Sequence, residues 1–236
     1  MIHNFAAAYN IRYPMLSDRG SAVIEKFEIL NPNVPRDVRF YGIPFPGQYL
    51  LAADGAVRAK LFLDDYQERP TASAVLVSDL GGAASGPSAE VGAGDVQARI
   101  ALSAPDTFSG NQLAFTLDVQ IAPGWHTYGE PLPQGEGLTP TAVVFDGELV
   151  SAQNLAMPKP IPMRFAALNE TYPVYEGDLH ASGTIKLKQK LKPGEYKIAG
   201  VFNYQECNDS ICKMPQALRF ELPITIEPMV PAAPKT

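Results

Sequence analysis

The chain has 236 residues, of which 46% are hydrophobic and 19% charged, a composition typical of a globular protein of one or two domains. Its net charge of -6 and its pI of about 5.1 exclude nucleic acid and anionic membrane surfaces as partners, since no basic run offsets this balance. No apolar stretch is long enough to cross a membrane, so we expect no direct membrane insertion.

The first residues do not look like a secretory signal. Residues 1–5 lack both the basic start and the apolar run that such a signal needs, which leaves a cytoplasmic location open. Apolar residues at Ile2, Phe5, Ala6 and Tyr9 already have helical spacing, without a capping residue before them. We therefore expect that a preceding segment has been lost, although the sequence does not tell whether Met1 is the true start.

Residues 1–78 predict a mixed α/β unit. After the first helix come a short strand at 12–16, a helix capped by Ser21, and a hairpin with an Asp54–Gly55 turn. Pro70 and Thr71 begin a closing helix. This order of elements is typical of the back half of a thioredoxin-like unit.

Two motifs in this half carry a resemblance. Residues 13–21, Tyr-Pro-Met-Leu-Ser-Asp-Arg-Gly-Ser, and residues 42–47, Gly-Ile-Pro-Phe-Pro-Gly, resemble the C-terminal part of the redoxin family related to alkyl hydroperoxide reductase and peroxiredoxins. The catalytic cysteine of that family would precede Met1, so we expect no peroxidase activity from this chain. The resemblance makes Pro46 a candidate for the cis-proline of the thioredoxin fold, with a rigid turn as the alternative. Without its central strand, this truncated unit should be poorly stable alone.

The remainder of the chain predicts a linker and a second domain. Residues 79–95 are rich in glycine, alanine and serine and predict a flexible linker. Residues 96–228 contain several short strands of alternating polarity separated by turns, which predicts an antiparallel β-sandwich. Residues 229–236 predict a disordered tail. The predicted protein is thus a truncated thioredoxin-like α/β unit followed by a β-sandwich.

The two cysteines of the chain, Cys207 and Cys212, have the spacing C-x4-C. Alternating apolar residues precede and follow them, so they lie at the facing ends of two predicted strands. Thiols in such positions can reach disulfide distance without movement of the backbone. We favour a reversible dithiol/disulfide.

Two other interpretations of the cysteine pair stay open. A structural disulfide closing so short a loop would contribute only about 2 kcal/mol in the chain-entropy model. A metal site is disfavoured, because His3, His126 and His180 are scattered and lack the paired spacing of zinc ligands. We therefore predict no metal.

A second resemblance joins three motifs. The run Tyr-Gln-Glu-Cys-x4-Cys-x-x-Pro at 204–215, Gly-Trp-His-Thr-Tyr at 124–128 and Tyr-Glu-Gly at 175–177 resemble the N-terminal periplasmic domain family of the thiol:disulfide interchange protein DsbD. The resemblance implies an immunoglobulin-like fold and no bound cofactor. It also implies a membrane-embedded electron donor, thioredoxin-like partners and a periplasmic location.

Carried over to this chain, the resemblance makes Cys207 and Cys212 the catalytic redox pair, with Cys212 forming the mixed disulfide. Tyr128 and His126 occupy positions where the family has aromatic residues beside the pair, so His126 departs from the pattern. A surface histidine and a proton-transfer role both remain open for it.

The resemblance also implies a cap loop, which residues 163–175 would supply. Leu168 or Tyr172 would then be the side chain that covers the disulfide. From charge alone, Glu206 and Asp209 should raise the pKa of a neighbouring thiol and Lys213 should lower that of Cys212, with no net sign predicted.

The leading hypothesis is a thiol:disulfide oxidoreductase that passes reducing equivalents to or from thioredoxin-like partners. One alternative is a non-enzymatic binding domain with a structural disulfide. Another is a fragment of a peroxide-reducing redoxin whose sandwich is a docking module.

Overall fold

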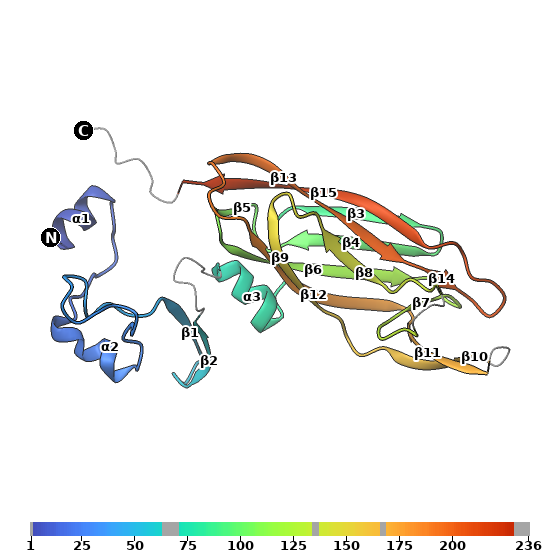
Figure 1. Ribbon diagram of the computed structural model, residues 1–236, viewed down its shortest axis with the longest axis horizontal. Coiled ribbons are helices and arrows are strands. Elements are labelled where there is room, and N and C mark those ends of the chain that lie inside the picture. The colour runs from blue at the N-terminus through green and yellow to red at the C-terminus, as the bar shows by residue number, and fades with distance from the viewer. Residues whose placement is uncertain (1, 63–70, 134–136, 166–168, 229–236) are drawn as a thin grey trace. The chain divides into compact units, whose positions relative to one another are not determined.

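The computed structural model describes residues 2–62, 71–133, 137–165 and 169–228. The chain divides into two compact units, residues 1–69 with 229–236, and residues 70–228 (Figure 1). The elements of the first unit are helix α1 (Ile2–Ala8), 3-10 helix η1 (Arg19–Ser21), helix α2 (Ala22–Lys26), and strands β1 (Gly47–Leu51) and β2 (Val57–Phe62).

The hairpin predicted in the first unit is present. Strands β1 and β2 pair in antiparallel register, from Gly47 opposite Phe62 to Leu51 opposite Val57. Gly55 has a φ of 84°, which only glycine adopts readily, and its N–H donates to the carbonyl of Ala52 at 2.9 Å. The Asp-Gly turn therefore formed where the sequence indicated it.

The start of α2 differs from the prediction. Ser21 precedes the helix but has a left-handed φ of 59° and makes no side-chain cap. The carboxylate of Asp18 instead accepts hydrogen bonds from the N–H groups of Val23, at 3.1 Å, and Ile24, at 3.0 Å. Asp18, three residues before Ser21, thus accepts hydrogen bonds from N–H groups in the first turn of α2, which have no partner within the helix.

A thioredoxin-like unit is not shown, which corrects the expectation for residues 1–78. Strands β1 and β2 form a two-stranded sheet, and no hydrophobic side chain is buried among residues 3–62. Large apolar side chains such as Phe5, Leu16 and Phe40 are exposed. A layered α/β fold needs helices packed over a sheet around a shared core, and no such core lies in these residues. Pro46 is not cis either, because the cis peptide bond of the described residues is Glu130–Pro131.

The second unit is mostly β-structure. Its elements are α3 (Ala72–Leu80), β3 (Ser88–Ala93), β4 (Val96–Leu102), β5 (Asp106–Phe108), β6 (Gln112–Ile121), β7 (His126–Tyr128), β8 (Ala142–Phe145), β9 (Val150–Ala156), β10 (Ile161–Phe165), β11 (Glu170–Tyr175), β12 (Asp178–Leu187), β13 (Gly194–Tyr204), β14 (Glu206–Cys207) and β15 (Gln216–Glu227).

Two of its sheets form a sandwich. One has the order β3-β4-β6-β12-β9 and the other β5-β15-β13-β8, and the long strands run along the unit in Figure 1. All neighbouring strands in these sheets are antiparallel except β5 and β15, which are parallel. A buried apolar core fills the space between the sheets, with fully buried side chains that include Phe115, Ile185, Phe202 and Leu222. This architecture is consistent with an immunoglobulin-like sandwich.

Helix α3 belongs to the sandwich and not to the first unit. The hydroxyl of Thr71 caps it by accepting from the N–H of Ala74 at 3.0 Å. The side chains of Ala74 and Val77 are buried against Ala114 of β6. The helix predicted to close the thioredoxin-like unit therefore covers the sandwich instead.

The segment expected to be a linker contains strand β3. Residues 88–93 pair with β4 from Ser88 opposite Ala101 to Ala93 opposite Val96. The side chains of Ala89 and Val91 pack against the sandwich core. The sequence does not predict β3 because its alternating residues are mostly small and have low strand propensity. Pairing with β4 stabilises the strand.

A third sheet, with the order β10-β11-β7-β14, lies at the end of the second unit away from α3 in Figure 1. It brings together segments from 126–128, 161–175 and 206–207, which are far apart in the sequence. None of the helices in the described residues is both long and apolar enough to span a membrane.

Candidate functional site

Cys207 and Cys212 form a disulfide with an S–S distance of 2.07 Å. Cys207 ends β14, and Cys212 faces it across an isolated antiparallel bridge. Both lie in the connection between β13 and β15, whose pairing starts at Tyr204 opposite Gln216. The prediction that the cysteines lie between two paired strands is confirmed.

Backbone and side-chain hydrogen bonds shape the loop between the two sulfurs. The side-chain oxygen of Asn208 accepts from the N–H groups of Ser210, at 2.8 Å, and Ile211, at 2.9 Å. The N–H of Lys213 donates to the carbonyl of Glu206 at 2.9 Å, which closes the base of the loop. Asparagine is well suited to this role because its side chain mimics a backbone turn.

The two cysteines differ in their exposure to solvent. Cys207 is 0% exposed, whereas Cys212 is an exposed residue. Its neighbours Ile211 and Met214 are 56% and 78% exposed. Cys212 is therefore the half of the disulfide that is accessible to solvent.

Tyr128 lies directly against the disulfide. Its hydroxyl oxygen is 3.3 Å from Cys207 Sγ and 3.7 Å from Cys212 Sγ. The Tyr128 side chain is only 3% exposed, and its ring packs edge-on against Tyr172 with the centroids 6.0 Å apart. Tyr128, Tyr172, Val174 and Cys207 form one buried cluster.

His126 is the cross-strand neighbour of Cys207. The two residues are register partners between β7 and β14, and directly opposite residues of an antiparallel pair place their side chains on the same face. The imidazole is 2% exposed and its ring contacts Phe165, with the centroids 5.3 Å apart. His126 is therefore a buried residue, and its interpretation as a surface histidine is wrong.

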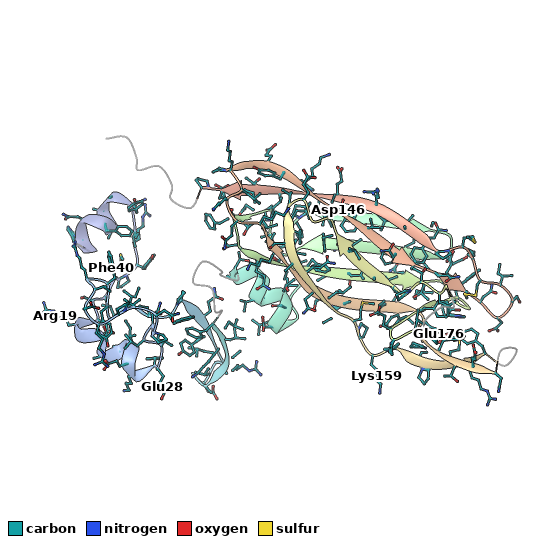
Figure 2. The ribbon with its side chains drawn as sticks, viewed as in Figure 1. Arg19, Glu28, Phe40, Asp146, Lys159 and Glu176 are labelled. Carbon is teal, nitrogen blue, oxygen red and sulfur yellow. A yellow bond between two sulfur atoms is a disulfide. The ribbon has the colours of Figure 1, made fainter. Side chains whose placement is uncertain are left out.

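Burial lowers the pKa of His126 from its ordinary value of 6.5, because the charged imidazolium loses its hydration. The carboxylates of Glu176, which is labelled in Figure 2, and of Asp209 oppose this effect without reversing it. Its Nε2 atom has no hydrogen-bond partner among the described residues. His126 is thus neutral at pH 7, with a nitrogen that is free to bond.

The predicted cap segment is only partly within the described residues. Leu168 lies outside them. Tyr172 lies on β11, is 3% exposed, and donates its hydroxyl proton to the carboxylate of Glu170. Phe165 of β10 packs on Tyr172 with the ring centroids 5.4 Å apart. The β10–β11 hairpin therefore brings Tyr172 into the cluster that contains Cys207.

The other two tyrosines near the motif have structural roles. Tyr204 stacks on Phe202 in the sandwich core and donates to the carbonyl of Ala93 at 2.8 Å. Tyr175 donates to the carbonyl of Pro158 at 2.9 Å. Tyr128 and Tyr172 are the tyrosines that share a buried cluster with Cys207 among the described residues.

A group of charged side chains flanks the disulfide. Glu206 Oε1 lies 2.9 Å from Lys213 Nζ, and the Glu206 side chain is 2% exposed. Lys213 Nζ also lies 2.8 Å from Asp95 Oδ2 and 4.1 Å from the ring centroid of Trp125. Hydrogen bonds to Asp95 and then to Glu206 raise the pKa of Lys213, so this lysine is charged at neutral pH.

The pairing within this group is not evident from the sequence. Glu206 and Lys213 were assigned opposing effects on a thiol, but they pair with each other. Their positions, one residue outside each cysteine, were the available signal, because the ends of a hairpin lie opposite each other. Asp95 ends the segment 79–95 that the sequence predicts to be a linker, so no local signal marks it as part of the site. No group of three or more metal-ligating side chains occurs in the part of the chain that the structure describes.

A protein-family model described as the N-terminal domain of the thiol:disulfide interchange protein DsbD matches residues 96–224. The chain belongs to this family. The match includes Tyr128, His126 and both cysteines, so the motifs that carried the resemblance lie within it. The matched region ends before the tail and begins after β3.

Solved structures give more distant likenesses. The N-terminal periplasmic domain of ScsB from Proteus mirabilis is 20% identical, with a TM-score of 0.42 over 59% of this chain and 51% of that one. The reduced DsbD N-terminal domain of Neisseria meningitidis is 12% identical, with a TM-score of 0.30 over 51% of this chain and 85% of that one. The chain thus spans about half of the ScsB chain that it matches. A search of curated protein sequences found no match.

A DsbD N-terminal domain with a disulfide-forming cysteine pair fits thiol-disulfide exchange in general. The family match lies outside residues 1–78, and a redoxin or peroxiredoxin domain is not shown there.

Proposed function

We propose that this protein is a thiol:disulfide oxidoreductase in which Cys207 and Cys212 are the reacting pair. The observation that carries the proposal is the unequal exposure of the two sulfurs in a DsbD-family domain, since Cys207 is 0% exposed and Cys212 is exposed. Such a pair has one sulfur for the partner and one protected sulfur to complete the exchange.

The exchange proceeds by two displacements at sulfur. A partner thiolate attacks Cys212 Sγ, a new bond forms between the partner and Cys212, and the Cys207–Cys212 bond breaks with Cys207 leaving as a thiolate. The partner's second thiol, once deprotonated, then displaces Cys212. The protein gains two electrons and two protons, and the partner becomes a disulfide. The opposite direction passes through the same mixed disulfide.

Two buried side chains assist the leaving sulfur in this proposal. The Tyr128 hydroxyl, 3.3 Å from Cys207 Sγ, donates a hydrogen bond as negative charge develops there. His126 lies opposite Cys207 on the neighbouring strand, and its Nε2 has no hydrogen-bond partner within the described part of the chain, so it offers a polar group beside the same sulfur. Tyr172 packs beside Tyr128 and keeps water from this side of the disulfide.

The proposed partners are those expected for a DsbD N-terminal domain. We propose that thioredoxin-like proteins exchange with Cys212 and that a membrane-embedded protein is the electron donor, in the periplasm. The exposed apolar side chains of Ile211 and Met214 support docking of a protein beside the exposed sulfur, because apolar surface around a reacting atom contributes binding.

The structural-disulfide alternative has less support. Closing a loop between residues only 5 apart contributes about 2 kcal/mol in the chain-entropy model, and the hydrogen bonds of Asn208 and Lys213 already hold this loop. A reduction potential well below about -300 mV would nevertheless identify such a brace, because structural disulfides have potentials in that range.

The test uses single-cysteine variants of the full chain. Cys207→Ser leaves Cys212, and Cys212→Ser leaves Cys207. Each reduced variant is mixed with a thioredoxin that keeps only its nucleophilic cysteine, activated as its thionitrobenzoate disulfide. We expect the Cys207→Ser protein to form a covalent complex and release thionitrobenzoate at least tenfold faster than Cys212→Ser. Equal rates, or no complex with either variant, would overturn the proposal.

A further inference from the structure

The loop that carries the disulfide is held at both ends by side chains other than cysteine. Glu206 directly precedes Cys207 and Lys213 directly follows Cys212, and their side chains pair at 2.9 Å. The main chains of the same two residues are joined by the hydrogen bond from the Lys213 N–H to the Glu206 carbonyl, also 2.9 Å. These contacts do not involve sulfur, so breaking the S–S bond does not remove them.

The pair is anchored to the turn between β3 and β4. The N–H of Asp95 donates to Glu206 Oε2 at 3.0 Å, and the carboxylate of Asp95 lies 2.8 Å from Lys213 Nζ. Gly94 leaves the space that this requires, because a Cβ at that position would lie 2.3 Å from Glu206 Oε1. The ring of Trp125 covers the ammonium group of Lys213 at 4.1 Å.

The burial of Glu206 makes the arrangement costly to open. A carboxylate that is 2% exposed is stable only when hydrogen bonds and a cation compensate for its lost hydration. If the loop opened on reduction, Lys213 would move away and leave this charge without its cation. The charge group, which we define as Asp95, Glu206 and Lys213, therefore favours the closed loop whether or not the cysteines are bonded.

We propose that Asp95, Glu206 and Lys213 are positioning residues that keep the two thiols close together in the reduced protein and thereby set the reduction potential of the pair. Thiols held close re-form their disulfide with a high effective concentration. A closed loop thus favours the disulfide over the dithiol and makes the reduced protein a stronger reductant. The biological use of this property rests on the proposed function, but the potential itself can be measured without a protein partner.

The first experiment measures the equilibrium of the full chain with glutathione redox buffers. Lys213→Met keeps the apolar stem beside Trp125 and removes the charge, and Glu206→Gln keeps the shape and removes the charge. We expect the equilibrium constant for disulfide formation to fall about tenfold in Lys213→Met, which is about 30 mV for a two-electron couple. Glu206→Gln should change it in the same direction.

Three further variants separate positioning from general effects of charge. Lys213→Arg keeps a cation and should restore most of the wild-type equilibrium. The double variant Glu206→Gln/Lys213→Met should shift it no further than Lys213→Met, since both changes remove the same pair. Glu221→Gln removes an exposed ion pair, Lys197 Nζ to Glu221 Oε2 at 2.7 Å, and should change the equilibrium less than twofold.

Wild-type equilibria in folded Lys213→Met and Glu206→Gln proteins would overturn the proposal. Should either variant fail to fold, hydrogen exchange on the wild-type protein still decides the question. The amide hydrogen of Lys213, bonded to the Glu206 carbonyl, should remain protected after reduction to within about tenfold of its rate in the oxidised protein. Complete loss of that protection on reduction would show that the loop opens and would equally overturn the proposal. Failure of the thioredoxin trapping experiment would leave these outcomes unchanged.

Discussion

The hydroxyl oxygen of Tyr128 lies 3.3 Å from Sγ of Cys207, the buried half of the disulfide. Because Cys207 is 0% exposed, no water takes the place of this donor when the sulfur becomes charged. In the proposed exchange, the Tyr128 hydroxyl therefore donates a hydrogen bond to the leaving Cys207 thiolate.

Replacing Tyr128 by phenylalanine should slow exchange with a partner thiol. A hydrogen bond to a charged group is worth about 1.5 to 3 kcal/mol, which corresponds to a rate about ten- to a hundredfold lower. The measurement is stopped-flow reduction of the oxidised protein by a reduced thioredoxin. Tyr175→Phe is the matched control, because its hydroxyl bonds to the Pro158 carbonyl and not to sulfur. A rate for Tyr128→Phe equal to that of the control would contradict the assigned role.

His126 should make the protein less stable in mild acid. Its pKa in the folded state lies below the ordinary value of 6.5 because burial disfavours the charged ring. The unfolded chain therefore binds this proton more readily than the folded protein. The contribution of His126 to the free energy of unfolding is constant well above pH 6.5 and falls as the pH drops from 6.5 towards the folded-state pKa.

The measurement for His126 is urea unfolding between pH 5 and pH 8, in the wild type and in His126→Phe. The variant cannot take up this proton, so its free energy of unfolding should fall less than that of the wild type below pH 6.5. Parallel pH profiles for the two proteins would mean that the imidazole is not held neutral by burial.

Gly94→Ala should disturb the charge group, and Gly177→Ala is its matched control. Both glycines have a left-handed φ, 64° and 65°, so alanine at either position costs about 1–2 kcal/mol of backbone strain. A Cβ at Gly94 meets Glu206 Oε1 at 2.3 Å, whereas among the described residues no heavy atom beyond the two chain neighbours lies within 4 Å of a Cβ at Gly177. Urea unfolding should show a larger loss of stability for Gly94→Ala, and its glutathione equilibrium should move in the direction of Lys213→Met. Identical values for the two variants would argue against close packing of Glu206 on the turn.

The single tryptophan of the chain, Trp125, should report the state of the loop, because the ammonium of Lys213 lies over its ring at 4.1 Å. Reduction of the wild-type protein should leave the emission maximum nearly unchanged if the loop stays closed. In Lys213→Met the ring loses this cation, and reduction should shift the emission to longer wavelength. A large shift in the reduced wild type would point to opening of the loop.

The sandwich and the cysteine pair were accessible from sequence because their signals are local. Alternating apolar residues on both sides of C-x4-C gave the strands, and three short motifs indicated the family. Local signals did not predict β3, because glycines and other small residues surround the alternating Ala89 and Val91. Helix α3 was predicted, but its position in the chain suggested that it packs on the first unit.

Other features of the site depend on the tertiary fold. No pattern in the sequence shows that His126 is buried, since its 2% exposure results from the approach of β10, β11 and β14. Asp95 and Lys213 are brought together across 118 residues. In residues 3–62 the local signals for helices and a turn are present, but they do not predict tertiary packing. No apolar side chain is buried there, so the elements do not form the predicted layered unit.

Helix α3 and strand β3 lie outside the stretch, residues 96–224, that matches the family. A fragment cut at residue 96 would uncover Ala114, leave β4 as a bare sheet edge and discard Asp95 from beside the cysteine loop. Unpaired edges of this kind invite aggregation. The smallest piece suited to expression in isolation therefore starts upstream of Thr71, about two dozen positions earlier than the matched boundary suggests.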